Sequence, residues 1–98
     1  MAYLKVYAAP DGGWLLDVQT DLIDVVETRV VIPLVPQRKA PPAANRLNPV
    51  FSIGDMRVVA VTQSLSAIPA SILGQPVADL SGRRDEITSA LDMLLHGF

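Results

Sequence analysis

The chain contains no cysteine and a single histidine, His96. The absence of cysteine excludes disulfides, thiolate nucleophiles and cysteine-ligated metal sites, and it suits a reducing compartment. A Ser-His-Asp arrangement would have to use His96, which lies in the last turn of a predicted helix, where little is available to orient its second ring nitrogen. The sequence therefore favours a binding protein over an enzyme, and we expect no cofactor and no metal.

Charged residues are also scarce: they make up 18% of the 98 residues, whereas 50% are apolar. This balance excludes a disordered chain, and the length predicts one domain over residues 1–98. With 8 basic and 10 acidic residues the net charge is −2, so no overall basic character favours direct contact with nucleic acid. Little polar surface is left to cover a small body, which favours a homodimer.

Long hydrophobic runs are missing as well. No apolar segment approaches the roughly 20 residues that a membrane-spanning helix needs. The first residues show no basic region followed by an apolar one, which is the pattern of a secretory signal. We therefore expect a cytoplasmic protein without a membrane partner.

Two segments near the start of the chain have the periodicity of strands. Ala2–Ala8 and Trp14–Gln19 place alternate residues on opposite faces, a period of two that is typical of half-buried strands. The turn-forming sequence Pro10–Gly13 separates them, and its glycines are free to adopt positive φ. Together these segments predict an antiparallel hairpin.

Further strands are expected where β-branched residues are dense. Arg29–Val35 contains Pro33, which has no N–H to donate, so this strand is expected at a sheet edge or with a bulge at the proline. Pro36–Pro49 carries four prolines and is predicted to be a long surface excursion. The other predicted strands are Val50–Ile53, Arg57–Thr62 and a short segment near Ser71–Leu73.

The periodicity changes from strand to helix after Ser81. Apolar residues such as Ile87 and Leu91 then recur at helical spacing, and the pattern continues to Phe98. Ser81 is a suitable N-cap, and Gly97 stands where a glycine ends a helix. A run of strands followed by one helix predicts a mainly β, α+β fold, with a small antiparallel barrel or sheet packed on a C-terminal helix.

Acidic residues cluster after the first predicted hairpin. Asp17, Asp21 and Asp24 recur at spacings of four and three, which could suggest a metal site or a carboxylate pair. Only Asp17 falls within a predicted strand, so no helix aligns the three carboxylates. We expect a solvated loop here, in which Asp21 or Asp24 is available to a contact surface.

Basic residues gather at two places. Arg83 and Arg84 lie at the unfavourable end of the helix dipole, which leaves either a functional role or salt bridges to Asp79 or Glu86. The proline-rich excursion carries three more basic residues, which could meet phosphates or an acidic peptide. No aromatic residues are interleaved with them, so a solvated loop is the favoured interpretation of this second group: Arg38, Lys39 and Arg46.

Five ordered blocks of the chain resemble the CcdB family of toxins. The resemblance covers essentially the whole chain, and the closing helix ends, as in the family, in glycine plus one apolar residue. It implies a Src-homology-3-like barrel related to that of the MazF toxins, with a C-terminal helix, a two-fold homodimer and a wing formed by Pro36–Pro49 and the strand after it. The blocks are Asp17–Asp24, Val31–Leu34, Ile53–Asp55, Pro69 with Ile72–Gly74, and Val77–Ser81.

The resemblance also implies a function. Family members are the toxins of toxin–antitoxin pairs: they bind the A subunit of DNA gyrase, trap its complex with cleaved DNA, and are neutralised by a CcdA-like antitoxin whose disordered tail wraps the toxin. A well-studied family pattern ends in Trp-Gly-Ile, so this chain keeps the glycine but has an imidazole in place of the indole. Carried over by position, the gyrase-binding residues are Asp92, Leu95, His96, Gly97 and Phe98 at the helix end, with Leu22 and Ile23 beside it, and Ser81.

Two alternatives remain open. One is an endoribonuclease of the MazF type, which needs an acid/base pair near a phosphate-binding arginine; Arg29 or Arg57 with a nearby carboxylate are the candidates. The other is a folded relative whose altered tip at His96–Phe98 no longer engages gyrase, and which binds only its antitoxin.

Overall fold

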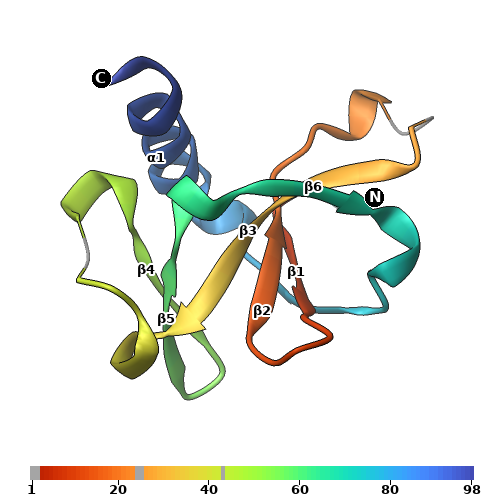
Figure 1. The fold of residues 1–98 in the computed structure, drawn as a ribbon, viewed down its shortest axis with the longest axis horizontal. Helices are drawn as coiled ribbons and strands as arrows, with labels where there is room; N and C mark the ends of the chain where they lie inside the picture. Colours follow the sequence, from red (N-terminus) through yellow and green to blue (C-terminus); the bar gives the residue numbers. More distant parts are fainter. Residues whose placement is uncertain (1–2, 24–25, 43) are drawn as a thin grey trace.

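The computed structural model describes residues 3–23, 26–42 and 44–98. Within them, seven strands form one antiparallel sheet: six follow the order β4-β5-β3-β2-β1-β7, and the seventh, β6, pairs with β3. The sheet curls into a half-barrel with the single α-helix packed at one end, which confirms the predicted fold class (Figure 1). The elements are β1 (Lys5–Ala8), β2 (Trp14–Asp17), β3 (Thr28–Pro36), β4 (Val50–Ile53), β5 (Met56–Ala60), β6 (Ser66–Pro69), β7 (Pro76–Asp79) and α1 (Arg84–His96).

The predicted hairpin is formed by β1 and β2, which pair in register with Tyr7 opposite Leu15. The turn requires glycine twice, because Gly12 and Gly13 have φ of +96° and +71°. A Cβ at Gly13 would also come within 3.2 Å of the Leu34 carbonyl oxygen on β3. The hairpin therefore lies close against the next strand of the sheet.

Both hairpin strands are shorter than the alternation predicts. β1 begins only after Leu4, whose φ of +63° interrupts the extended chain, and the predicted start at residue 2 lies outside the described residues. β2 ends at Asp17 rather than at Gln19. The reason is local: the Val30 N–H of β3 donates to Oε1 of the Gln19 side chain at 3.0 Å, in place of a backbone carbonyl.

The expectation for Pro33 is wrong, because β3 is the central strand of the sheet. Its first half pairs with β6 as far as Val31, and its last residues pair with β5 from Leu34 onward. The Pro33 carbonyl accepts a hydrogen bond from the Val61 N–H at 2.9 Å, at the junction between these two partners. A residue's N–H and C=O point to the same neighbour in an antiparallel strand. The missing donor therefore faces the junction, where no strand requires it.

The chain between residues 64 and 80 differs most from the prediction. The strand expected near Ser71–Leu73 lies earlier, as β6, and the 3₁₀ turn η5 (Ala70–Ile72) occupies its place. β7 was not predicted; it is a short edge strand that pairs with β1 through a bulge. Both strands are four residues long and are specified by partners distant in sequence, so local periodicity carries little information about them.

The helix begins two residues later than the Ser81 N-cap predicts. Residues Ser81–Arg83 form the 3₁₀ turn η6, and α1 starts at Arg84. Asp79 accounts for the difference, because its Oδ1 accepts the Ser81 N–H at 2.8 Å and so caps the earlier turn. The predicted end is confirmed: Gly97 has φ of +79°, and its N–H donates to the Met93 carbonyl at 3.1 Å.

The proline-rich excursion is held against the barrel rather than solvated throughout. It contains the 3₁₀ turns η2 (Gln37–Lys39) and η3 (Asn45–Leu47). Asn48 is buried, and its Nδ2 donates to the Ala60 carbonyl at 3.0 Å. Arg46 Nε donates to the carbonyl of Ser89 on α1 at 3.1 Å. Arg46 is exposed, as Arg38 and Lys39 are, but its bond to Ser89 ties the excursion to the helix.

A single core fills the space between the curled sheet and α1. Ile87 is the helix residue at its centre, and Leu80 and Leu4 close it from the chain segments before α1 and β1. Across the described residues, no helix combines the length and hydrophobicity needed to cross a membrane. The remaining buried core residues are Val6, Leu16, Ile32, Leu34, Phe51, Val58 and Ala60.

Candidate functional site

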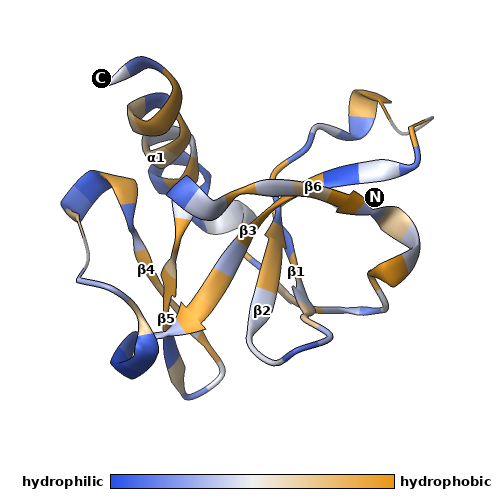
Figure 2. Ribbon diagram, viewed as in Figure 1, coloured by the Kyte–Doolittle hydropathy of each residue, from blue (hydrophilic) through white to orange (hydrophobic). Residues whose placement is uncertain are grey.

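The end of α1 exposes apolar and aromatic side chains. Leu95 is 64% exposed and Phe98 79%. The rings of His96 and Phe98 lie on either side of Gly97, with centroids 6.2 Å apart and planes tilted by 34°. Asp92 lies one turn earlier and is half-buried. We call Asp92 and Leu95–Phe98 the tip; the apolar bands of its last turns stand away from the sheet (Figure 2).

A second exposed apolar surface lies on the connection between β2 and β3. The 3₁₀ turn η1 (Asp21–Ile23) buries no residue, and Leu22 is 92% exposed. Ile23 and Val26 are also exposed large apolar residues. We call Leu22, Ile23 and Val26 the loop surface.

One chain does not bring the predicted site residues together. η1 and the end of α1 lie on opposite sides of the molecule (Figure 1). Leu22 and Ile23 are therefore not beside the tip within one chain, contrary to the expectation. Ser81 is exposed at the other end of the helical segment, and the 13 residues of α1 rise by about 1.5 Å each, or roughly 20 Å in all. The predicted residues occupy three separate places.

The acidic residues near the loop surface belong to a buried ionic cluster. Asp17 is completely buried and Arg29 is 7% exposed. Arg29 Nε donates to Asp17 Oδ2 at 2.7 Å and Nη2 donates to Asp17 Oδ1 at 3.0 Å, a bidentate pair. Nη2 also donates to Asp21 Oδ1 at 3.1 Å. The expected solvated loop is therefore wrong for Asp17 and Asp21, while Asp24 lies outside the described residues.

The cluster perturbs the ionisation of its members. Hydrogen bonding to Asp17 is the main cause of a raised pKa at Arg29. Burial, reinforced by the negative charge of Asp17, raises the pKa of the Tyr7 hydroxyl. Sequence reasoning missed the ion pair, although one signal was present: Asp17 and Arg29 are the charged residues of otherwise apolar strand segments. Such charges are rarely buried unless they are paired.

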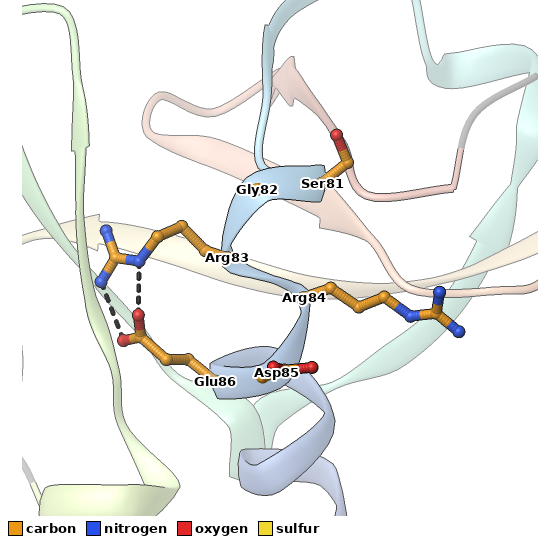
Figure 3. Close-up of a pocket in the computed structure, with 6 residues that line it drawn as sticks. All are labelled: Ser81, Gly82, Arg83, Arg84, Asp85 and Glu86. Carbon is orange, nitrogen blue, oxygen red and sulfur yellow. Dashed lines mark hydrogen bonds and ion pairs between the residues drawn. The ribbon is translucent and has the colours of Figure 1, made fainter.

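The start of α1 carries the two arginines that lie at the unfavourable end of the helix dipole. Arg83 Nη2 donates to Glu86 Oε2 at 2.8 Å, and Arg83 Nε makes a second bond to the same carboxylate, which confirms the predicted salt bridge (Figure 3). The Arg83 guanidinium also lies 4.9 Å from the Phe51 ring centroid. Arg84 points the other way, with its guanidinium 5.8 Å from the Tyr3 ring. These local partners account for both charges.

Asp79 has a structural role beside this turn. The Ser81 backbone N–H and then Lys5, whose Nζ is 3.0 Å from Asp79 Oδ2, lower the pKa of Asp79 to about 2. A salt bridge from Arg83 to Asp79 was the alternative expectation, and Lys5 fills that position instead. Ser81 to Glu86 line an open hollow of about 330 Å³, in which Arg83 and Glu86 are bound to each other and the Ser81 N–H is bound to Asp79.

The two arginines of the nuclease alternative lie in different environments. Arg29 has carboxylates beside it, but it is buried and bound to them, so it is not presented to a phosphodiester. Arg57 is exposed on β5, with Ser52 opposite it on β4. In residues 3–23, 26–42 and 44–98, no group of three or more His, Asp or Glu side chains could hold a metal ion. The exposed features of the molecule suit contact with another macromolecule.

Comparisons with known proteins agree with this fold. The chain is similar to the solved structure of an endoribonuclease in complex with its cognate antitoxin from mycobacterial species. The two share 15% sequence identity at a TM-score of 0.75, over 97% of this chain and 94% of the other, so the similarity is one of fold. The family model of the CcdB protein matches residues 3–97. Because this match spans nearly the whole chain, the protein belongs to the CcdB family.

Proposed function

We propose that this protein is the toxin of a type II toxin–antitoxin pair, that it acts in the cytoplasm, and that it binds the A subunit of DNA gyrase and traps the gyrase–cleaved-DNA complex. The CcdB family match over residues 3–97 carries the proposal. A CcdA-like antitoxin is its proposed neutralising partner. The fold relative that is bound to its own antitoxin supports a partner of this kind.

The tip supports binding rather than catalysis. Aromatic and aliphatic side chains that are exposed in the free protein supply contact area when a partner covers them. Gly97 ends the helix in a left-handed conformation, so Phe98 leaves the helix axis as a separate apolar group. An imidazole at position 96 covers less area than an indole. Losing a central aromatic anchor costs about 2 kcal/mol or more, roughly a 30-fold loss of affinity, which Phe98 offsets in part.

We further propose that the active form is a two-fold homodimer that presents two tips. Met93, on the last turns of α1, is one of the exposed large apolar residues and is available to a second copy. A dimer would also bring the loop surface of one chain to the same assembly as the tip of the other. Light scattering after size exclusion tests this point: a monomer at micromolar concentration contradicts it.

A gyrase–DNA cleavage assay with the purified protein tests the function. We expect linear, covalently trapped DNA to accumulate with the wild-type chain. Deletion of His96–Phe98 should abolish trapping and leave the thermal midpoint nearly unchanged, since these residues are exposed. Val77→Ala is the matched control, because Val77 is an exposed apolar residue of β7 outside the proposed site. If no trapped DNA appears at high protein concentration, the proposal is wrong.

The fold relative is an endoribonuclease, and this activity is therefore the second candidate function. Incubation with single-stranded RNA separates the two: discrete fragments, lost in an Arg57→Ala variant, favour the nuclease. The third candidate is a relative that binds only its antitoxin. Overexpression without growth arrest, together with tight antitoxin binding, favours that role.

A further inference from the structure

The loop surface lies on an unusually long connection. β2 and β3 are antiparallel neighbours, and residues 18–27 join them, whereas hairpin loops commonly have 2–5 residues. Within this connection, η1 is a single 3₁₀ turn that buries none of its residues. Burial therefore cannot hold Leu22 and Ile23 in place, and an exposed turn is ordinarily among the least stable parts of a protein.

The buried ion pair of Arg29 and Asp17 joins the two ends of the connection. Arg29 binds Asp17 across the two ends through Nε and Nη2, and Nη2 also donates to the Gln19 carbonyl at 2.9 Å. The Gln19 N–H returns to Asp17 Oδ1 at 3.0 Å. Both charges are removed from water, which is costly unless paired, and such groups are best attested where they fix one conformation. Here the conformation that they fix is the base of the connection.

A second tether runs from the same guanidinium to the loop surface itself. Asp21, the first residue of η1, accepts from Arg29 Nη2 through Oδ1 and from the Tyr3 N–H through Oδ2, the latter at 3.2 Å. The next residue, Leu22, donates its N–H to Thr20 Oγ1 at 3.2 Å. The turn that presents Leu22 is thus held at its first residue by two separate parts of the barrel.

We propose that Arg29 and Asp21 are positioning residues for a binding surface formed by Leu22 and Ile23. They do not touch the partner; they keep η1 ordered while its apolar side chains remain exposed. A partner that engages an ordered turn loses less conformational entropy than one that must order it. The inference rests on the proposed function, in which Leu22 and Ile23 contact the A subunit of gyrase.

The experiment is a double-mutant cycle with the full chain and the purified A subunit of gyrase. Asp21→Asn is nearly isosteric, but its amide nitrogen cannot accept the hydrogen bonds that both carboxylate oxygens accept. Leu22→Ala removes the contact itself. We expect each variant to weaken binding about tenfold or more, and the double variant to bind only slightly more weakly than Leu22→Ala, because both act through one surface. Lys5→Met, which removes the exposed salt bridge to Asp79 and none of the hydrogen bonds to Asp21, is the control and should bind as the wild type does.

Amide exchange distinguishes positioning from general stability. Asp21→Asn should speed exchange in residues 18–23 while the amides of α1 and β5 stay protected. Arg29→Lys, which keeps the charge but not the bidentate geometry, should give the same pattern. Wild-type affinity in Asp21→Asn, additive losses in the cycle, uniform loss of protection, or failure of both variants to fold each overturns the inference. Failure of the wild type to bind gyrase overturns the proposed function instead.

Discussion

The tip and the loop surface both present exposed apolar side chains, but different interactions hold the two segments in place. Each presents large apolar side chains to solvent on a short segment with little core beneath it. The tip extends a helix whose backbone hydrogen bonds are internal, and Ile87 and Ala90 anchor that helix in the core. The loop surface has no regular element to extend, and Arg29 holds it through buried carboxylates. Order at an exposed site can therefore come from continuity with a helix or from a specific ionic tether.

The tip and the loop surface should respond differently to substitutions. A helix frays gradually from its end, whereas a buried ion pair that loses one partner leaves an uncompensated charge in the protein interior. The loop surface should therefore be sensitive to single substitutions far from its exposed residues. The tip should be sensitive mainly to changes within its own last turn.

The largest expected effect is at the buried anchor of the loop. Arg29→Met leaves the Asp17 carboxylate buried without its partner, and we expect unfolding to become easier by about 3–5 kcal/mol. This is a large part of the roughly 5–15 kcal/mol that stabilises a domain. Urea denaturation measures it. Ile87→Ala, an apolar anchor of the tip, is the comparison: we expect a loss of about 2–5 kcal/mol without faster amide exchange specific to residues 18–23. A loss below about 1 kcal/mol for Arg29→Met would contradict a structural role for the pair.

A smaller effect is expected at the end of the helix. Gly97→Ala places a Cβ on a residue with φ of +79°, although no neighbouring atom lies within 4 Å of it. The cost is therefore one of backbone conformation, about 1 kcal/mol. A thermal melt measures it, and trapping should fall because Phe98 is redirected. Gly74→Ala is the control: it also meets no neighbour, and its φ is not in the left-handed region. Equal effects of the two substitutions would show that the left-handed conformation does not matter.

The smallest expected effect is a loss of stability at low pH that comes from Asp79, which lies before α1 in the chain. Asp79 has a pKa of about 2 in the folded protein against 3.8 ordinarily, because the Ser81 N–H and Lys5 favour its charged form. A lowered pKa in the folded state means that the contribution is present above about pH 4 and is lost as the pH falls toward about 2. Asp79→Asn should therefore be less stable than the wild type at about pH 6, and this difference should shrink by about pH 3. Urea unfolding at both values measures it; a constant difference would contradict the assignment.

Much of the fold could be predicted because its signals are local. The hairpin of β1 and β2 and the helix that ends at Gly97 follow from periodicity and turn residues within a few positions. β7 and the true position of β6 could not be predicted in this way, since their pairing with β1 and β3 joins distant segments. Pro33 shows a different limit of sequence-based prediction. Its lack of an N–H donor was recognised, but the change of partner strand that makes this lack harmless depends on the pairing of the whole sheet.

The residues of the candidate site stay a prediction, and their arrangement could not be predicted from the sequence. Exposure of Leu22, Leu95 and Phe98 agrees with the expected contact role, yet their separation on opposite sides of the chain is visible only in three dimensions. The pairing of Asp17 with Arg29 joins residues on two strands. The sequence spacing of two residues does not predict such a contact, although a charged residue inside an apolar strand segment indicates that it has a partner of opposite charge.

Pro33 has a consequence beyond the packing of one molecule. Where β3 passes from β6 to β5, the sheet has a short interval in which a backbone edge is not covered by a regular strand. A free N–H at such an interval is a point of attachment for an extended segment of another chain, the first step of edge-to-edge aggregation. Because proline has no N–H and its one carbonyl is taken by Val61, this interval offers an incoming chain neither donor nor free acceptor. Pro33 thereby closes this interval of the sheet to strand addition.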